Sequence, residues 1–338
     1  MGPDHKTVDF RQAIFDQAEN LRSGSAAFRD AVAEVDLRAL CEGTIVLGGI
    51  GASAHALIPA VLALRAAGRR AFAVSAAELR EANAAQLGDA FVLVSQSGAS
   101  AETVAALERI EGAPVVAISA HGDSPLARAA QAWLPLGPLP DTPVATLSYT
   151  ATLQALGMLC GVLLGPSNID SAWEQLPELA AALIERADPV VEELAGPFAA
   201  VRALDAIGSG PAAASAGETA LLAREGLRLP ASGIETREYL HGPLEAVGEG
   251  FGCVVFGRAR EHGLAAALAS FGAAVVLLTD EAPSNGVGVP VLELPRVPDL
   301  AAPVLQILPV QLLADHVARL RGIEIGQLRR QQDDTKVA

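Results

Sequence analysis

Three serines, a glutamine and a glycine stand together in residues 95–100 (SQSGAS), directly after the apolar run FVLV. Their side-chain donors are the hydroxyls of Ser95, Ser97 and Ser100 and the amide of Gln96. Gly98 permits a tight turn, and a helix that begins near Ser100 would add free N–H groups with a positive electrostatic end. The spacing therefore favours a phosphate-binding loop. The alternative is a polar turn in which Ser100 caps the helix.

The segments around this loop are typical of a parallel α/β fold. Short apolar runs predict strands at residues 44–48, 71–74, 91–94 and 114–118, and helical periodicity predicts helices at about 52–67 and 100–110. Two amphipathic helices are expected within residues 8–40. In a doubly wound sheet the loop falls at the carboxyl edge, where ligands bind.

The pattern restarts after a largely helical connection over about residues 147–204. Further strands are expected at 206–210, 251–256, 274–279 and 289–294, with helices at about 215–227 and 302–321. We therefore expect N-terminal helices in residues 1–40, a first domain in 41–170, a second in 171–322 and a tail in 323–338.

The composition excludes several classes of partner. The chain has 338 residues, 51% of them hydrophobic, and a net charge of -15, which disfavours nucleic acid and anionic membranes.

The N-terminus lacks a signal peptide, and the apolar run 151–165 is short for a membrane span, so we expect a buried helix and a cytoplasmic protein. Cys41, Cys160 and Cys253 are interpreted as reduced core cysteines, and no metal-binding spacing occurs.

The segment SQSGASAETVAAL resembles the signature of the sugar isomerase (SIS) domain family, which includes the isomerase half of glucosamine-6-phosphate synthase. Gly51-Ala52-Ser53 stands where the family has G-T-S, and Val144-Ala145-Thr146 where it has V-A-S. Later matches include the glycine turn 208–210 and His241-Gly242-Pro243. The resemblance implies two tandem SIS domains, each a flavodoxin-like parallel sheet flanked by helices, a sugar-phosphate substrate and no cofactor.

The resemblance also implies roles for individual residues. Glu225 would move the proton between C1 and C2 of the sugar, and His241 would assist ring opening and complete the neighbouring subunit's site in a homodimer. Glu218 lies on the same helical face as Glu225, as a supporting group or a solvated charge. His55, where the synthase has asparagine, is interpreted as structural or substrate-tuning. Implied substrate and phosphate contacts are Gly51, Ser53, Ser95, Gln96, Ser97, Ser100, Val144 and Thr146.

The lysines depart from the family pattern. The synthase forms a Schiff base through a C-terminal lysine, but Asp333 stands at that position and Leu222 replaces a second lysine. The sequence holds two lysines, Lys6 and Lys336, and Lys336 could act in this role if the tail shifts by three residues. We therefore expect a Schiff-base-independent enzyme in which hydroxyls and helix N-termini hold most of the phosphate charge.

These residues favour a deaminating isomerase that converts glucosamine 6-phosphate to fructose 6-phosphate and ammonia. A fructosamine-6-phosphate deglycase and an aldose–ketose phosphosugar isomerase use the same proton chemistry and stay open. A non-catalytic sugar-phosphate sensor is the alternative from another class. The presence of both Glu225 and His241 favours catalysis, because phosphate binding alone requires neither.

Overall fold

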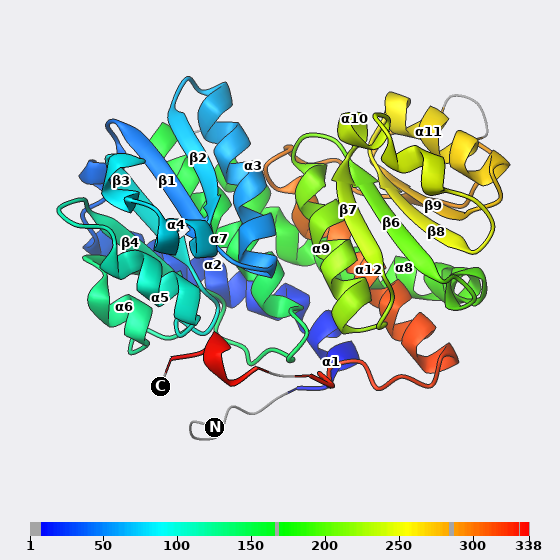
Figure 1. The fold of residues 1–338 in the computed structure, drawn as a ribbon, viewed down its shortest axis with the longest axis horizontal. Coiled ribbons are helices and arrows are strands. Elements are labelled where there is room, and N and C mark those ends of the chain that lie inside the picture. The colour runs from blue at the N-terminus through cyan, green and yellow to red at the C-terminus, as the bar shows by residue number, and fades with distance from the viewer. Residues whose placement is uncertain (1–7, 166–168, 284–286, 331, 338) are drawn as a thin grey trace.

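The computed structural model describes residues 8–165, 169–283, 287–330 and 332–337, in two α/β halves that lie side by side (Figure 1). The first holds a five-stranded parallel sheet of β1 (Thr44–Gly49), β2 (Arg70–Ser75), β3 (Ala90–Val94), β4 (Val115–Ser119) and β5 (Ala132–Pro135). Its order is β2-β1-β3-β4-β5. This is the flavodoxin-like order that was expected, with its switch point between β1 and β3.

The second sheet repeats this order. Its strands are β6 (Ala203–Gly208), β7 (Ala231–Glu235), β8 (Phe251–Phe256), β9 (Ala274–Thr279) and β10 (Val291–Glu293). Read from β7, the order is β7-β6-β8-β9-β10, and every pairing is parallel. Two similar halves were therefore predicted correctly at the level of architecture.

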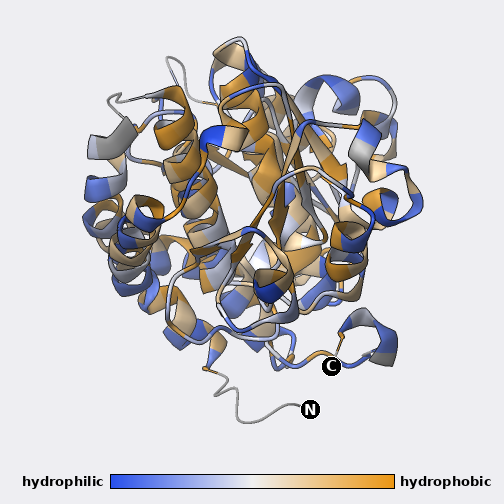
Figure 2. Ribbon diagram, turned by 90° about the vertical axis from the view of Figure 1, so that its left-hand side faces the viewer, coloured by the Kyte–Doolittle hydropathy of each residue, from blue (hydrophilic) through white to orange (hydrophobic). Residues whose placement is uncertain are grey.

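Helices flank both sheets. The longer ones are α2 (Gln17–Glu34), α3 (Ala52–Ala66), α5 (Ala101–Glu108), α7 (Leu147–Leu164), α8 (Ile169–Ala199), α9 (Ala212–Glu225), α11 (Ala259–Ser270) and α12 (Ala302–Leu320). The short ones are α1 (Phe10–Phe15), α4 (Ala76–Glu81), α6 (Pro125–Ala129) and α10 (Thr236–Tyr239). In Figure 2 the strands are mostly orange and the surrounding helices carry the blue segments, which is the pattern of a buried parallel sheet.

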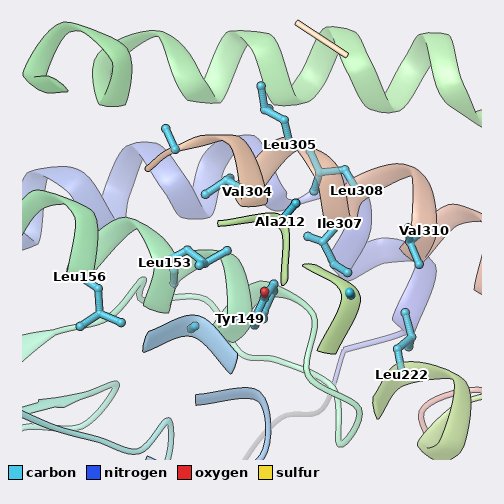
Figure 3. Close-up of a cluster of buried hydrophobic side chains, with 14 of the residues drawn as sticks. Tyr149, Leu153, Leu156, Ala212, Leu222, Val304, Leu305, Ile307, Leu308 and Val310 are labelled. Carbon is cyan, nitrogen blue, oxygen red and sulfur yellow. The ribbon is translucent and has the colours of Figure 1, made fainter. Parts of the chain in front are cut away.

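The two halves share one hydrophobic core. Figure 3 shows Tyr149 and Leu153 of α7, Leu222 of α9 and Ile307 of α12 in one buried cluster. Helix α7 is apolar and long enough to cross a membrane by length and composition, but 78% of it is buried inside the protein. The prediction of a buried helix at this position is confirmed.

An ion cluster fastens the N-terminal helix to the second half. The Arg11 guanidinium on α1 pairs with Asp188 of α8 and, at 2.9 Å, with Asp315 of α12. His316 Nε2 lies 2.8 Å from the other Asp188 oxygen. The N-terminal helices are therefore part of the packed body of the protein.

Candidate functional site

The serine loop lies at the switch point of the first sheet. Strand β3 ends at Val94, and the loop of residues 95–100 leads into α5. Next to it, β1 ends at a turn in which Gly51 has φ +58°, and α3 begins. Neighbouring strands thus deliver two helix N-termini to one edge of the sheet, and helix N-termini favour bound anions.

The loop's hydroxyls face one another. Ser95 Oγ donates to Ser100 Oγ at 3.0 Å, and Ala99 N donates to Ser97 Oγ at 3.3 Å. Ser100 occupies the N-cap position of α5, but its side chain makes no capping hydrogen bond. The alternative in which Ser100 serves as a side-chain cap is therefore wrong, because its hydroxyl is turned toward the loop.

A cavity of about 160 Å³ opens beside the loop. Four residues singled out from the sequence line it: Ser53, Gln96, Ser100 and Lys336. Its further lining residues are Ile50, Ala52, Thr142, Pro143, Ala145, Ser148, Tyr149 and Thr152. The site is therefore formed by the Gly51 turn, the serine loop, the start of α7 and the C-terminal tail.

Val144 and Thr146, which we expected to contact the substrate, do not line this cavity. Both are buried, and Thr146 Oγ1 donates to the Val144 carbonyl at 3.0 Å. The Asp141 carboxylate draws this segment in, because it accepts from the backbone N–H groups of Thr146 and Ser148 at 3.0 and 2.8 Å. The residues between and beside them line the cavity instead, namely Thr142, Pro143, Ala145 and Ser148.

Thr142, Ser148, Tyr149 and Thr152 are cavity residues that the sequence reasoning missed. Ser148, Tyr149 and Thr152 lie on the first turns of α7, and their helical spacing next to V-A-T is the signal that could have found them. The Tyr149 hydroxyl is buried and has no hydrogen-bond partner among the described residues.

The C-terminal tail crosses from α12 to the serine loop, as the red segment of Figure 1 shows. Lys336 Nζ donates to Ser97 Oγ at 2.9 Å and lies 3.4 Å from Ser100 Oγ. Beside the hydroxyls and helix N-termini, which we expected to hold most of the phosphate charge, this position thus also holds an ammonium group. The contact joins residues 239 positions apart in the sequence, so local patterns could not predict it.

Helix α9 passes α3 in the opposite direction and brings its acidic residues to this region. A Cβ at Gly217 would lie 2.7 Å from His55, and one at Gly51 would lie 3.9 Å from Leu221. Successive turns of α9 thus face earlier turns of α3. Glu225, one turn after Leu221, lies past the start of α3, toward the carboxyl edge of the first sheet.

Glu218 and His55 form a pair between these helices. His55 Nδ1 lies 3.3 Å from Glu218 Oε2, and the Glu218 side chain is 3% exposed. The interpretation of Glu218 as a solvated charge is excluded by this burial. Burial raises the pKa of Glu218, and the contact with His55 partly opposes this rise.

Glu225 is the last residue of α9 and is partly buried. Burial, and then the negative charge of Glu218, raises its pKa to about 7. Glu225 does not line the 160 Å³ cavity; it lines a separate opening with Arg228, Arg329 and Arg330. Residues 328–330 of the tail thus line the Glu225 opening, while Lys336 lies on the serine loop.

His241 lies away from both openings. It is exposed, and it directly follows α10, which lies at the top of the second half in Figure 1, while the C-terminal segment lies at the bottom of the first. The described part of one chain thus does not bring His241 to its own Glu225.

The matching edge of the second sheet has a different charge. A cavity of about 290 Å³ there is lined by Arg258 and three carboxylates, those of Glu261, Asp280 and Asp299. Arg258 makes two 2.7 Å hydrogen bonds to Asp280, so its charge is already neutralised. This cavity is net negative and disfavours phosphate.

The cysteines differ in burial. Cys160 and Cys253 are buried as expected, but Cys41 is exposed, because it follows the turn after Leu40 at the surface.

In the described parts of the chain, no group of three or more His, Cys, Asp or Glu side chains could hold a metal ion.

Residues 40–161 match the SIS domain family, over the sheet that carries the serine loop. The chain carries a SIS domain. It is 31% identical over 294 residues to glutamine–fructose-6-phosphate aminotransferase (isomerizing) of Pyrococcus horikoshii, which covers 82% of this chain and 49% of that protein. The chain thus spans about half the length of the curated relative, and its SIS domain is homologous to the isomerase half of such enzymes.

Solved structures share the fold over nearly the whole chain. The C-terminal domain of the aminotransferase from Francisella tularensis superposes with a TM-score of 0.83 at 22% identity, covering 94% of this chain and 98% of that one. Glucosamine-6-phosphate deaminase from Thermotoga maritima gives 0.78 at 20% identity, covering 97% and 99%. These likenesses show the fold of both halves together.

Proposed function

We propose that this protein is a phosphosugar isomerase that deaminates an amino-sugar 6-phosphate, converting glucosamine 6-phosphate to fructose 6-phosphate and ammonia. The observation that carries the proposal is the position of Glu225. This carboxyl group, with a pKa of about 7, lies one helical turn past the glycine turn that borders the serine loop. A base whose pKa is near the working pH suits proton abstraction beside a carbonyl.

The proposed chemistry begins with the phosphate in the loop. The N–H groups at the starts of α3 and α5, the loop hydroxyls of Ser95, Ser97 and Ser100, and the amide of Gln96 hold the dianion. Ser53 contacts the phosphate or a sugar hydroxyl. Gly51 allows the backbone of its turn to come close to the sugar. The reactive end of the sugar then extends toward Glu225.

Glu225 takes the proton from C2 of the open-chain aldose and returns it to C1. The electron pair of the C2–H bond forms the enolamine, and protonation at C1 gives an imine at C2. Water adds to this imine and releases ammonia, which leaves the ketose phosphate. Burial of Glu225, and then the charge of Glu218, raise the pKa of Glu225, and the charge of His55 partly opposes this rise.

We further propose that the second half is a SIS domain as well, so that the chain holds two in tandem. The supporting observation is the shared strand order of the two sheets. The net negative cavity of the second sheet favours one phosphate site per chain.

A homodimer with shared sites is part of the proposal. His241 is exposed and remote from the Glu225 of its own chain. In a two-fold dimer, His241 of each chain would assist ring opening in the site of the other.

The test is an NMR assay of purified protein with three substrates: glucosamine 6-phosphate, fructose 6-phosphate with ammonia, and fructosamine 6-phosphates. The matched variants are Glu225→Gln and Glu108→Gln, because Glu108 also ends a helix but is exposed. We expect turnover of glucosamine 6-phosphate that Glu225→Gln abolishes and Glu108→Gln preserves. Turnover of the fructosamine adducts instead would identify a deglycase, interconversion of unaminated sugars an aldose–ketose isomerase, and tight binding without turnover a sensor.

A further inference from the structure

The tail presents Lys336 to the phosphate loop through backbone pairing. Val337 N donates to the Ala99 carbonyl at 2.9 Å, and Lys336 forms an antiparallel bridge with Ser100. These contacts fix the backbone of the tail at Lys336, and from there the ammonium group reaches Ser97 and Ser100. Its location is therefore a property of the folded tail.

In the described part of the chain, this ammonium is held by hydroxyl groups and not by a salt bridge. It contacts two hydroxyl oxygens, and among the described residues it forms no salt bridge with a carboxylate. The chain carries a net charge of -15 and one other lysine, so a lysine ammonium at this position is unusual for its composition. An incoming dianion would find this ammonium beside the hydroxyls that bind it.

We propose that Lys336 is the cation of the phosphate site, and that the tail already holds it against the loop before a sugar phosphate binds. The inference rests on the proposed function, since it names a residue that recognises the phosphate of that substrate. A phosphate oxygen takes the place of Ser97 Oγ as the acceptor of the ammonium N–H. The bound phosphate then joins the tail to the starts of α3 and α5.

The geometry assigns Lys336 to the phosphate end of the sugar and not to its carbonyl end. Lys336 Nζ lies on Ser97 and Ser100, while Glu225 is next to tail residues 328–330. An imine with the ketose would need Nζ at C2, which is separated from the C6 phosphate by the length of the sugar chain. Arginine at residue 336 therefore preserves the role, although it forms no imine.

The experiment measures binding of fructose 6-phosphate, inorganic phosphate and fructose by calorimetry to four proteins: wild type, Lys336→Gln, Lys336→Arg and the control Lys6→Gln. We expect Lys336→Gln to weaken both phosphate ligands roughly tenfold to hundredfold, as for loss of a hydrogen bond between charged groups. Lys336→Arg and Lys6→Gln should stay within about threefold of wild type. Fructose binding should be the same in all four.

Two results would overturn this inference while leaving the proposed function intact. One is wild-type affinity for fructose 6-phosphate in Lys336→Gln. The other is a Lys336→Arg protein as defective as Lys336→Gln, together with borohydride trapping of the ketose on Lys336 of the wild type. Failure of the wild-type protein to bind any phosphate ligand would instead contradict the proposed function and this inference together.

Discussion

At the scale of single residues, the fall of kcat/KM at low pH, which is the acid limb of the pH profile, should follow the protonation of Glu225. Its pKa of about 7 lies above the ordinary value, so the active carboxylate is lost as the pH falls through neutrality. We expect kcat/KM to decline below about pH 7 and to stay level just above it. The measurement is the rate of sugar-phosphate turnover between pH 5 and 9.

Glu218→Gln provides the matched control for this limb. The charge of Glu218 raises the pKa of Glu225, so its removal should move the acid limb to lower pH. If the acid limb of the pH profile stays at the same pH in Glu218→Gln, the group that titrates is not Glu225. If Glu225→Gln still shows the acid limb, the limb belongs to another group.

At the scale of elements, the serine loop depends on Gly98. This residue has φ +63°, and a Cβ there would lie 2.0 Å from Ser124 Oγ, whereas Gly112 has φ +76° with nothing near. We expect Gly112→Ala to cost about 1 kcal/mol from backbone strain alone. Gly98→Ala should cost more and weaken phosphate binding at least about tenfold. Urea unfolding and calorimetry measure the two effects, and equal behaviour of both variants would contradict a fixed loop geometry.

The elements also show what the sequence could predict. Continuous apolar runs such as 251–256 and 274–279 gave strands with the observed bounds, because both faces of a parallel sheet are buried. Strands β5 and β7 were missed, since AWLP ends in proline and ASGIE has exposed residues and a glycine. The helix α11 (AREHGLAAALAS) was also missed, because its glycine interrupts the periodic pattern.

The candidate site was predicted where its signal is local. The serine loop and the Gly51 turn could be found from strand–turn–helix spacing. The cavity wall from Thr142 to Thr152 depends on how Asp141 folds the start of α7, and Lys336 reaches the loop through a contact across the whole chain. Such contacts are set by tertiary packing, which a single sequence does not display.

At the scale of the whole molecule, the separation of His241 from Glu225 predicts subunit complementation. A mixed dimer of His241→Ala and Glu225→Gln chains holds one site with both changes and one intact site. Co-refolded equal amounts of the two inactive variants should therefore recover roughly 25% of wild-type activity. Activity that stays at the level of the separate variants, in a protein that sediments as a dimer, would contradict the shared site.

The central claim is that a sugar phosphate held by the serine loop exchanges a carbon-bound proton with Glu225. The most direct measurement is the incorporation of solvent deuterium at C1 of fructose 6-phosphate, followed by NMR in D2O, because it does not depend on the amine or on the net reaction. We predict that the wild-type protein exchanges one C1 hydrogen and that Glu225→Gln binds the sugar but exchanges it at least about 100-fold more slowly. Exchange by Glu225→Gln at the wild-type rate would contradict the account.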